Sequence, residues 1–221
     1  MTFIKEELKQ MWGLISTHFV PVAIISFSTL LMLVSREKWM MQPPFHIDGI
    51  RNLSINRFFL WGIAPLIFGM LITRLSPKKM GLGLGNYRYW LPVSLIFLAL
   101  VLPFIYGASS MGDFQKFYRA KNFHLGKYFI ETLLMLTGWE FFFRGFMTVG
   151  LKDSLKEGSI LFQMVPFTLL HMGKPLVECI ACIPAGLFWG YVCYKSESFW
   201  PALIMHMAVN ITLKCGSVGY F

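Results

Sequence analysis

The sequence predicts an all-α integral membrane protein, built as a polytopic bundle of seven to eight transmembrane helices. Of its 221 residues, 56% are hydrophobic and only 14% are charged, whereas soluble domains carry about 25% charged residues. Long apolar runs recur along the chain, and the loops between them hold most of the charge. A few polar side chains interrupt these runs, and we expect them to face an intramembrane cavity because exposure to lipid is costly.

Seven apolar runs give the direct count of membrane helices. They comprise residues 18–34, 58–73, 89–107, 128–150, 158–172, 177–194 and 198–214. A helix needs roughly 17–25 residues to cross a bilayer. The fifth run is therefore short, and it predicts either a shallow helix or a polar flank at membrane depth. We expect residues 18–221 to form a single integral membrane domain.

Residues 1–17 are predicted to form an amphipathic helix at the membrane interface, which would be the eighth element. Its apolar residues fall on one helical face: Ile4, Leu8, Met11, Trp12 and Ile15. A helix of this kind binds lipid through its apolar face. Charged residues precede any long apolar run and no small-residue cleavage site follows, which argues against a cleavable signal peptide.

The formal net charge of +9 suits loops beside anionic lipid head groups. Lys and Arg lie mostly between the apolar runs, and no basic cluster exists apart from these membrane flanks. Phosphate binding needs a contiguous basic surface. We therefore expect the lipid bilayer, and no nucleic acid, to be a partner of this chain.

The most unusual polar pair lies inside the fourth run, in the segment Trp139-Glu140-Phe141-Phe142-Phe143-Arg144. A charged side chain at membrane depth costs of order 2.5–3.5 kcal/mol on insertion scales. Glu140 and Arg144 are four residues apart on a predicted helix, so they can pair directly. The pair is either a packing device or part of a reaction site, and its place in a membrane segment favours the reaction site.

Two downstream runs contribute histidine and asparagine. His171 ends the fifth run, and His206 and Asn210 project to one side of the last run because they are four residues apart. A carboxylate or an imidazole can take a proton from water, and an imidazole and an amide can stabilise an oxyanion. This set therefore predicts hydrolysis. Zinc bound by Glu140, His171 and His206 is the alternative to a site without a cofactor.

The polar residues form three motifs that resemble those of the CPBP family, the CAAX protease and bacteriocin-processing intramembrane endopeptidases, also called type II CAAX endopeptidase-like or Abi proteins. The motifs are Glu140-Phe-Phe-Phe-Arg144-Gly145, Phe167-Thr-Leu-Leu-His171 and His206-Met-Ala-Val-Asn210. Their order and separation fit the family, and the resemblance covers roughly residues 128–214.

The resemblance implies a glutamic-type intramembrane protease, of the class formerly called metallo-, that hydrolyses a peptide bond with activated water and no covalent intermediate. Glu140 and His171 would then activate the water. His206 and Asn210 would hold the oxyanion, and Arg144 would orient Glu140. The expected substrate is a membrane-embedded or lipid-modified peptide or protein, and the expected location is the prokaryotic cytoplasmic (inner) membrane. No motif identifies the substrate-binding residues.

The sequence departs from the family pattern at Trp139. The first family motif usually opens with two adjacent glutamates, and the leading one is generally assigned as the water-activating base. Either Glu140 takes that role, another carboxylate takes it, or the protein is not a protease. Glu178 is the other candidate, although it also suits the first turn of a helix that starts at Pro175. The alternative function is a non-proteolytic CPBP-fold membrane protein with an immunity, assembly or binding role.

Overall fold

The computed structural model describes residues 2–37 and 47–220. The regular structure of these residues is helical, and they contain no strand beyond one isolated bridge between Met172 and Lys174. The all-α class predicted from the sequence is confirmed.

The described residues form α-helices, two π-helical segments and one 3-10 turn. In chain order they are α1 (Thr2–Thr17), α2 (Phe19–Val34), α3 (Asn52–Phe58), the π-helical η2 (Phe59–Ile63), α4 (Ala64–Leu71), the 3-10 turn η3 (Lys78–Met80), α5 (Tyr87–Ser109), α6 (Gly112–Tyr118), α7 (Leu125–Glu140), the π-helical η4 (Phe141–Val149), α8 (Lys152–Leu155), α9 (Gly158–Leu169), α10 (Leu176–Ser196) and α11 (Trp200–Ser217).

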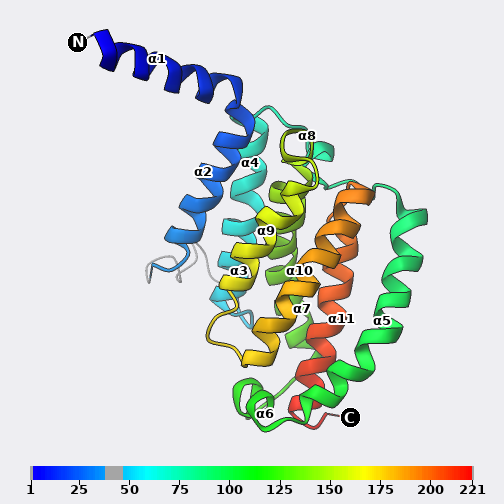
Figure 1. Cartoon of the computed structure of the whole chain (residues 1–221). Coiled ribbons are helices and arrows are strands. Elements are labelled where there is room, and N and C mark those ends of the chain that lie inside the picture. Colours follow the sequence, from blue (N-terminus) through cyan, green and yellow to red (C-terminus); the bar gives the residue numbers. More distant parts are fainter. Residues whose placement is uncertain (1, 38–46, 221) are drawn as a thin grey trace.

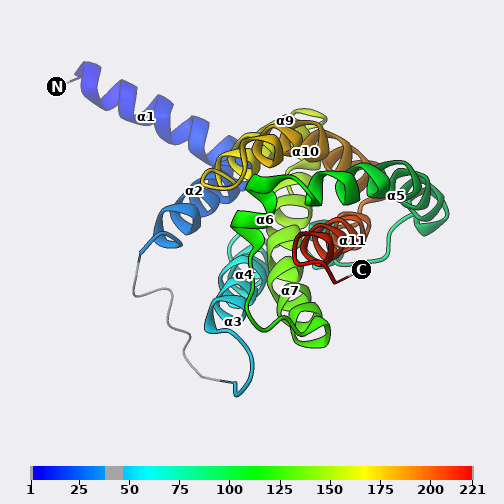
Figure 2. The ribbon, with the colours of Figure 1, turned by 90° about the horizontal axis from the view of Figure 1, so that it is seen from below.

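Most of the long helices run side by side, whereas α1 projects away from them (Figure 1). The axes of residues Phe3–Thr17 and Phe19–Val34 meet at 89°. Seen along the bundle, α7 lies between the α3–α4 pair and α11, while α5 lies at the edge (Figure 2). The break between α1 and α2 falls where the sequence predicted an interfacial helix to end.

Among the described residues, three continuous helical segments are long and apolar enough to cross a membrane: Asn52–Leu71, Tyr87–Ser109 and Leu176–Ser196. The bent pair α1–α2 adds a fourth if it counts as one span. The predicted seven to eight membrane helices are therefore not confirmed. One reason is helix length, because α9 has only 12 residues and a full crossing needs roughly 17 or more.

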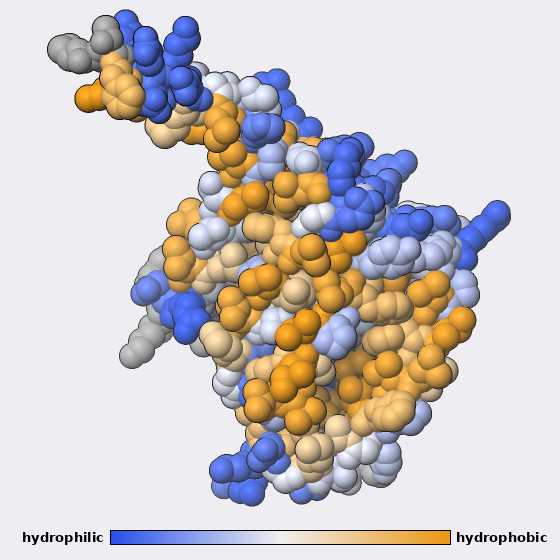
Figure 3. Space-filling view, viewed as in Figure 1, coloured by the Kyte–Doolittle hydropathy of each residue, from blue (hydrophilic) through white to orange (hydrophobic). Residues whose placement is uncertain are grey.

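The outer surface of the bundle is strongly apolar. Large hydrophobic side chains are exposed along α5, among them Leu95, Ile96, Leu100 and Phe104. In the space-filling view, hydrophobic residues cover the middle of the molecule, and hydrophilic residues gather near its upper and lower ends and on α1 (Figure 3). A soluble monomer rarely exposes so large an apolar surface, so this belt supports an integral membrane protein.

The innermost element is η4, which continues α7 without a break. All nine of its residues are buried. Phe142, Phe143 and Phe146 are completely inaccessible, and the Phe142 ring lies 4.5 Å from the ring of Trp61 in η2. This aromatic packing holds the end of α7, and with it Glu140, at the centre of the bundle.

The π-helical turns of η4 begin directly after Glu140. The Thr148 hydroxyl donates to the carbonyl of Phe143, five residues earlier, at 2.8 Å. A neighbouring loop presses against this segment, because a Cβ atom at Gly145 would lie 2.6 Å from the carbonyl oxygen of Met80. Only glycine fits at position 145, which explains one small residue of the first motif. Single π-helical turns occur frequently at functional sites.

Candidate active site

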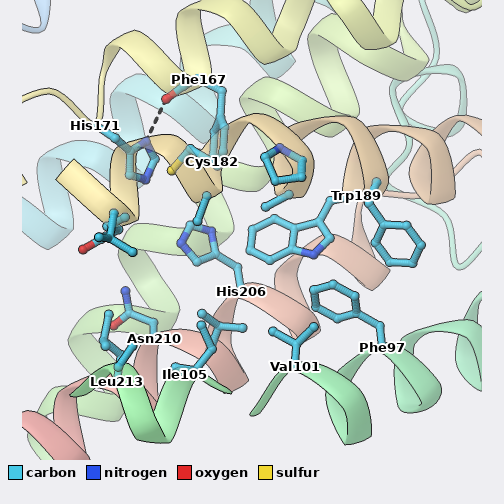
Figure 4. A pocket seen from close by; sticks show the side chains of 18 of the residues that line it. Phe97, Val101, Ile105, Phe167, His171, Cys182, Trp189, His206, Asn210 and Leu213 are labelled. Carbon is cyan, nitrogen blue, oxygen red and sulfur yellow. Dashed lines mark hydrogen bonds between the residues drawn. The ribbon is translucent and has the colours of Figure 1, made fainter. Parts of the chain in front are cut away.

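A pocket of about 400 Å³ lies between α5, α10 and α11. Its walls are mostly apolar and include Phe97 and Val101 of α5 and Trp189 of α10 (Figure 4). The polar side chains among its lining residues are His171, Glu178, His206 and Asn210. The structure therefore brings four of the six predicted site residues to one pocket.

Glu140 lies behind His206 and not among the lining residues of the pocket. Its carboxylate is fully buried, and its Oε1 accepts a hydrogen bond from Nδ1 of His206 at 2.5 Å. Because a carboxylate accepts from Nδ1, the lone pair of a neutral His206 is on Nε2. This position therefore does not favour Glu140 as a base that acts directly on water, which is the role that the family resemblance implies for it.

Arg144 balances the charge of Glu140. The Nε atom of Arg144 lies 3.3 Å from Oε2 of Glu140, and both side chains are fully buried. The guanidinium carbon also lies 3.9 Å from the centre of the Phe167 ring, a cation–π contact that gains strength when desolvated. Arg144 is therefore placed where the sequence predicted it, as the partner of Glu140.

His171 occupies the turn between α9 and α10. Its Nδ1 atom lies 2.7 Å from the carbonyl oxygen of Phe167, which can only accept, so Nδ1 carries the proton and Nε2 keeps its lone pair. Burial, followed by the charge of Lys174, lowers the pKa of His171 to about 3. Its ring lies 6.5 Å from that of His206, so two imidazole side chains can approach one bound substrate.

Asn210 lies one helical turn after His206 on α11, as its spacing predicted. Its Oδ1 atom accepts a hydrogen bond from the hydroxyl of Tyr128 on α7. The amide nitrogen is then the atom left to the pocket, as the orientation in Figure 4 shows. Tyr128 was missed from the sequence, because a tyrosine near the start of an apolar run is an ordinary interfacial residue.

Trp139 fills the space beside His171. The centres of their rings are 5.6 Å apart, and the indole also packs against Trp61 at 5.7 Å and Phe143 at 4.9 Å. Indole can donate a hydrogen bond but cannot take a proton from water. The place of the usual leading glutamate is thus occupied by an aromatic side chain with no basic atom.

Glu178 lines the same pocket but already has partners. Its two oxygens lie 2.9 and 2.8 Å from the hydroxyl of Tyr118 on α6, and Lys174 pairs with it at 2.6 Å. It also stands in the first turn of α10, where the helix dipole favours an acid. Because its oxygens are already engaged by a phenol and an ammonium group, these contacts favour a structural role for Glu178.

The donor set does not fit a zinc ion at Glu140, His171 and His206. Oε1 of Glu140 is taken up by Nδ1 of His206, and the second oxygen faces Arg144. Within residues 2–37 and 47–220, no group of three or more His, Cys, Asp or Glu side chains has a geometry suited to a metal ion. We therefore derive no step through a metal.

Fold and pocket together define a helical integral membrane protein with a polar site in an apolar pocket. Residues 122–212 match the family described as Type II CAAX prenyl endopeptidase Rce1-like. This segment contains every predicted site residue, and the match confirms the resemblance of the chain to the CPBP family. No curated protein and no solved structure matches the chain.

Proposed function

We propose that the chain is an intramembrane endopeptidase that hydrolyses a peptide bond in a membrane-embedded or lipid-modified substrate. The observation that carries this proposal is the convergence of His171, His206 and Asn210 on one apolar pocket. Glu140 accepts a hydrogen bond from His206 on the side of the imidazole that faces away from the pocket. An apolar pocket with a few convergent polar groups is the usual form of a small-molecule or peptide site.

The donor and acceptor atoms support a water-mediated reaction. Nε2 of His206, polarised by Glu140, takes a proton from a water molecule whose oxygen attacks the peptide carbonyl carbon. Nε2 of His171 accepts a hydrogen bond from the same water and orients it. The amide nitrogen of Asn210 donates to the oxyanion. His206 then returns the proton to the amine nitrogen as the C–N bond breaks.

This division of roles differs from the one that the family resemblance implies. There His206 holds the oxyanion and the carboxylate activates water. Here Glu140 has no place on the pocket wall, so it acts through His206. Arg144 lies beside Oε2 of the buried Glu140 carboxylate, and Nδ1 of His206 donates to its Oε1, so Glu140 sets the tautomer and orientation of the imidazole.

A reconstitution experiment tests the proposal. The purified chain is placed in liposomes together with a peptide extract from membranes, and new peptide ends are identified by mass spectrometry. We expect cleavage with the unaltered chain and with His18→Ala, an exposed histidine outside the pocket, and loss of cleavage with His171→Ala and His206→Ala. Retained cleavage in both pocket variants would refute the site assignment.

Trp139 favours a second candidate, a CPBP-fold protein that binds a partner without cleaving it. Its indole leaves no proton acceptor at the position next to His171. This candidate predicts that the two pocket variants preserve the cellular phenotype, whereas the endopeptidase predicts that they abolish it. A location in the prokaryotic cytoplasmic membrane belongs to either proposal, and fractionation of cell membranes would test it.

A further inference from the structure

Each polar side chain that could act in the pocket is held by a group next to it. Nδ1 of His206 is bound by Glu140, and Nδ1 of His171 by the carbonyl of Phe167. The third contact is the hydrogen bond that the Tyr128 hydroxyl donates to Oδ1 of Asn210. These three contacts determine which atom of each side chain remains available to a ligand.

The atoms that remain available to a ligand differ in whether they accept or donate hydrogen bonds. Both histidines, when neutral, keep a lone pair on Nε2 and therefore accept hydrogen bonds. Asn210 is the opposite case, because its oxygen is occupied by Tyr128 and its Nδ2 group has two protons to donate. Of the three, Asn210 is thus the donor that an oxyanion in the pocket can use.

We propose that Tyr128 is a positioning residue that makes Asn210 a hydrogen-bond donor toward the pocket. The inference rests on the endopeptidase function proposed above. The oxygen and the NH₂ group of the Asn210 amide are nearly equal in shape. Without the hydrogen bond from the Tyr128 hydroxyl, the amide can therefore rotate and present its oxygen to the pocket. An oxygen facing a developing oxyanion repels it, whereas an N–H group stabilises it.

The surroundings of Tyr128 allow the hydroxyl to be removed without disturbing the ring. The ring packs against Phe123 at 5.5 Å, and the ammonium of Lys214 lies 5.8 Å from its centre. Tyr128→Phe keeps both of these contacts and loses only the hydroxyl. Tyr194→Phe is the matched control, because the Tyr194 hydroxyl bonds to Glu157 and Tyr194 lies outside the pocket lining.

The first readout does not depend on turnover. The chain has asparagines at positions 52, 56, 86, 122 and 210, so selective ¹⁵N labelling gives few side-chain amide signals, and Asn210→Ala assigns the signal of interest. We expect Tyr128→Phe to shift the Asn210 amide signal and Tyr194→Phe to leave it in place. An unchanged Asn210 signal in Tyr128→Phe would overturn the proposal.

The second readout is catalytic. With a peptide that the unaltered chain cleaves, we expect Tyr128→Phe to lower kcat about ten-fold with KM nearly unchanged, and Asn210→Ala to lower it roughly 100-fold. The double variant should be no slower than Asn210→Ala, because Tyr128 acts through that amide. Fully additive losses would overturn the proposal. If the unaltered chain cleaves nothing, the endopeptidase function fails, and the amide signal still decides the role of Tyr128.

Discussion

The Nδ1 atom of His206 on α11 lies 2.5 Å from Oε1 of Glu140, which ends α7. This contact links a residue of the pocket wall to a carboxylate that water cannot reach. It also ties together two helices whose contacting residues are 66 positions apart in the sequence. The proposed chemistry depends on this pair more than on any other contact.

Removing the charge of Glu140 tests that dependence. We expect Glu140→Gln to lower the rate of peptide cleavage by at least about 100-fold, the low end of what a general base contributes, because His206 loses the anion that polarises it. Product formation is measured with the reconstituted chain. Glu197→Gln is the control, since Glu197 is largely exposed and pairs with Lys152 at the surface; an equal loss in both variants would contradict the prediction.

Arg144 is predicted to matter for stability. Arg144→Ala leaves the Glu140 carboxylate buried without its ion pair and removes the contact with Phe167. Breaking a buried pair from one side costs about 3–5 kcal/mol. Unfolding in mixed micelles should show a loss of this size, whereas the exposed control Arg88→Ala should change little. A loss below about 1 kcal/mol for Arg144→Ala would be at odds with the observed pairing.

Trp139 is predicted to be a packing residue of the site. Trp139→Ala removes the ring contacts to Trp61, Phe143 and His171 and should destabilise the fold by about 3–5 kcal/mol. Trp139→Phe keeps an aromatic ring there and should retain cleavage. Unfolding in mixed micelles measures the loss of stability, and the reconstituted chain measures cleavage. Abolished cleavage in a well-folded Trp139→Phe variant would assign the indole a chemical role instead.

The pH dependence of stability follows from His171. Its pKa is lowered by burial to about 3, while in the unfolded chain histidine titrates near its ordinary value of about 6.5. The unfolded state therefore binds an additional proton as the pH falls below about 6.5, and stability is lost progressively down to about pH 3. We expect His171→Gln to reduce the slope of the unfolding free energy against pH over this window. An unaltered slope would contradict the buried, neutral histidine.

The first helix is predicted to lie in the membrane surface. α1 meets α2 at 89°, and its apolar residues Leu8 and Trp12 are more than half exposed. Nitroxide labels at Leu8→Cys and Lys9→Cys, in a chain whose native cysteines are replaced by alanine, point about 100° apart around the helix. In liposomes, oxygen, which concentrates in the lipid, should relax the label at position 8. A water-soluble nickel complex should relax the label at position 9. Equal access of the nickel complex to both would argue against interfacial burial.

The sequence predicted the spacing of polar residues within a helix better than their arrangement between helices. The four-residue spacings of Glu140 with Arg144 and of His206 with Asn210 follow from helical periodicity, and the structure confirms that each pair shares a helical face. Periodicity within one helix contains no information about which atom meets a neighbouring helix. The turn of Glu140 toward His206, away from the pocket, therefore became apparent only in the structure.

Other features depended on tertiary packing in the same way. Tyr128 meets Asn210 across 82 residues, and no local pattern marks such a pair. The close approach of Gly145 in η4 to the carbonyl oxygen of Met80 is likewise a contact between distant segments. The number of membrane helices was also not determined by hydropathy, because a run such as 158–172 forms a helix, Gly158–Leu169, that is shorter than a crossing requires.

The most direct test of the central claim compares the N-termini of membrane and secreted peptides, by mass spectrometry, between cells that carry the unaltered chain and cells that carry Glu140→Gln. Endopeptidase action through the Glu140–His206 pair predicts a set of new N-termini that is present with the unaltered chain and lost with the variant at equal protein level. Identical sets of N-termini in the two cell lines would contradict the account.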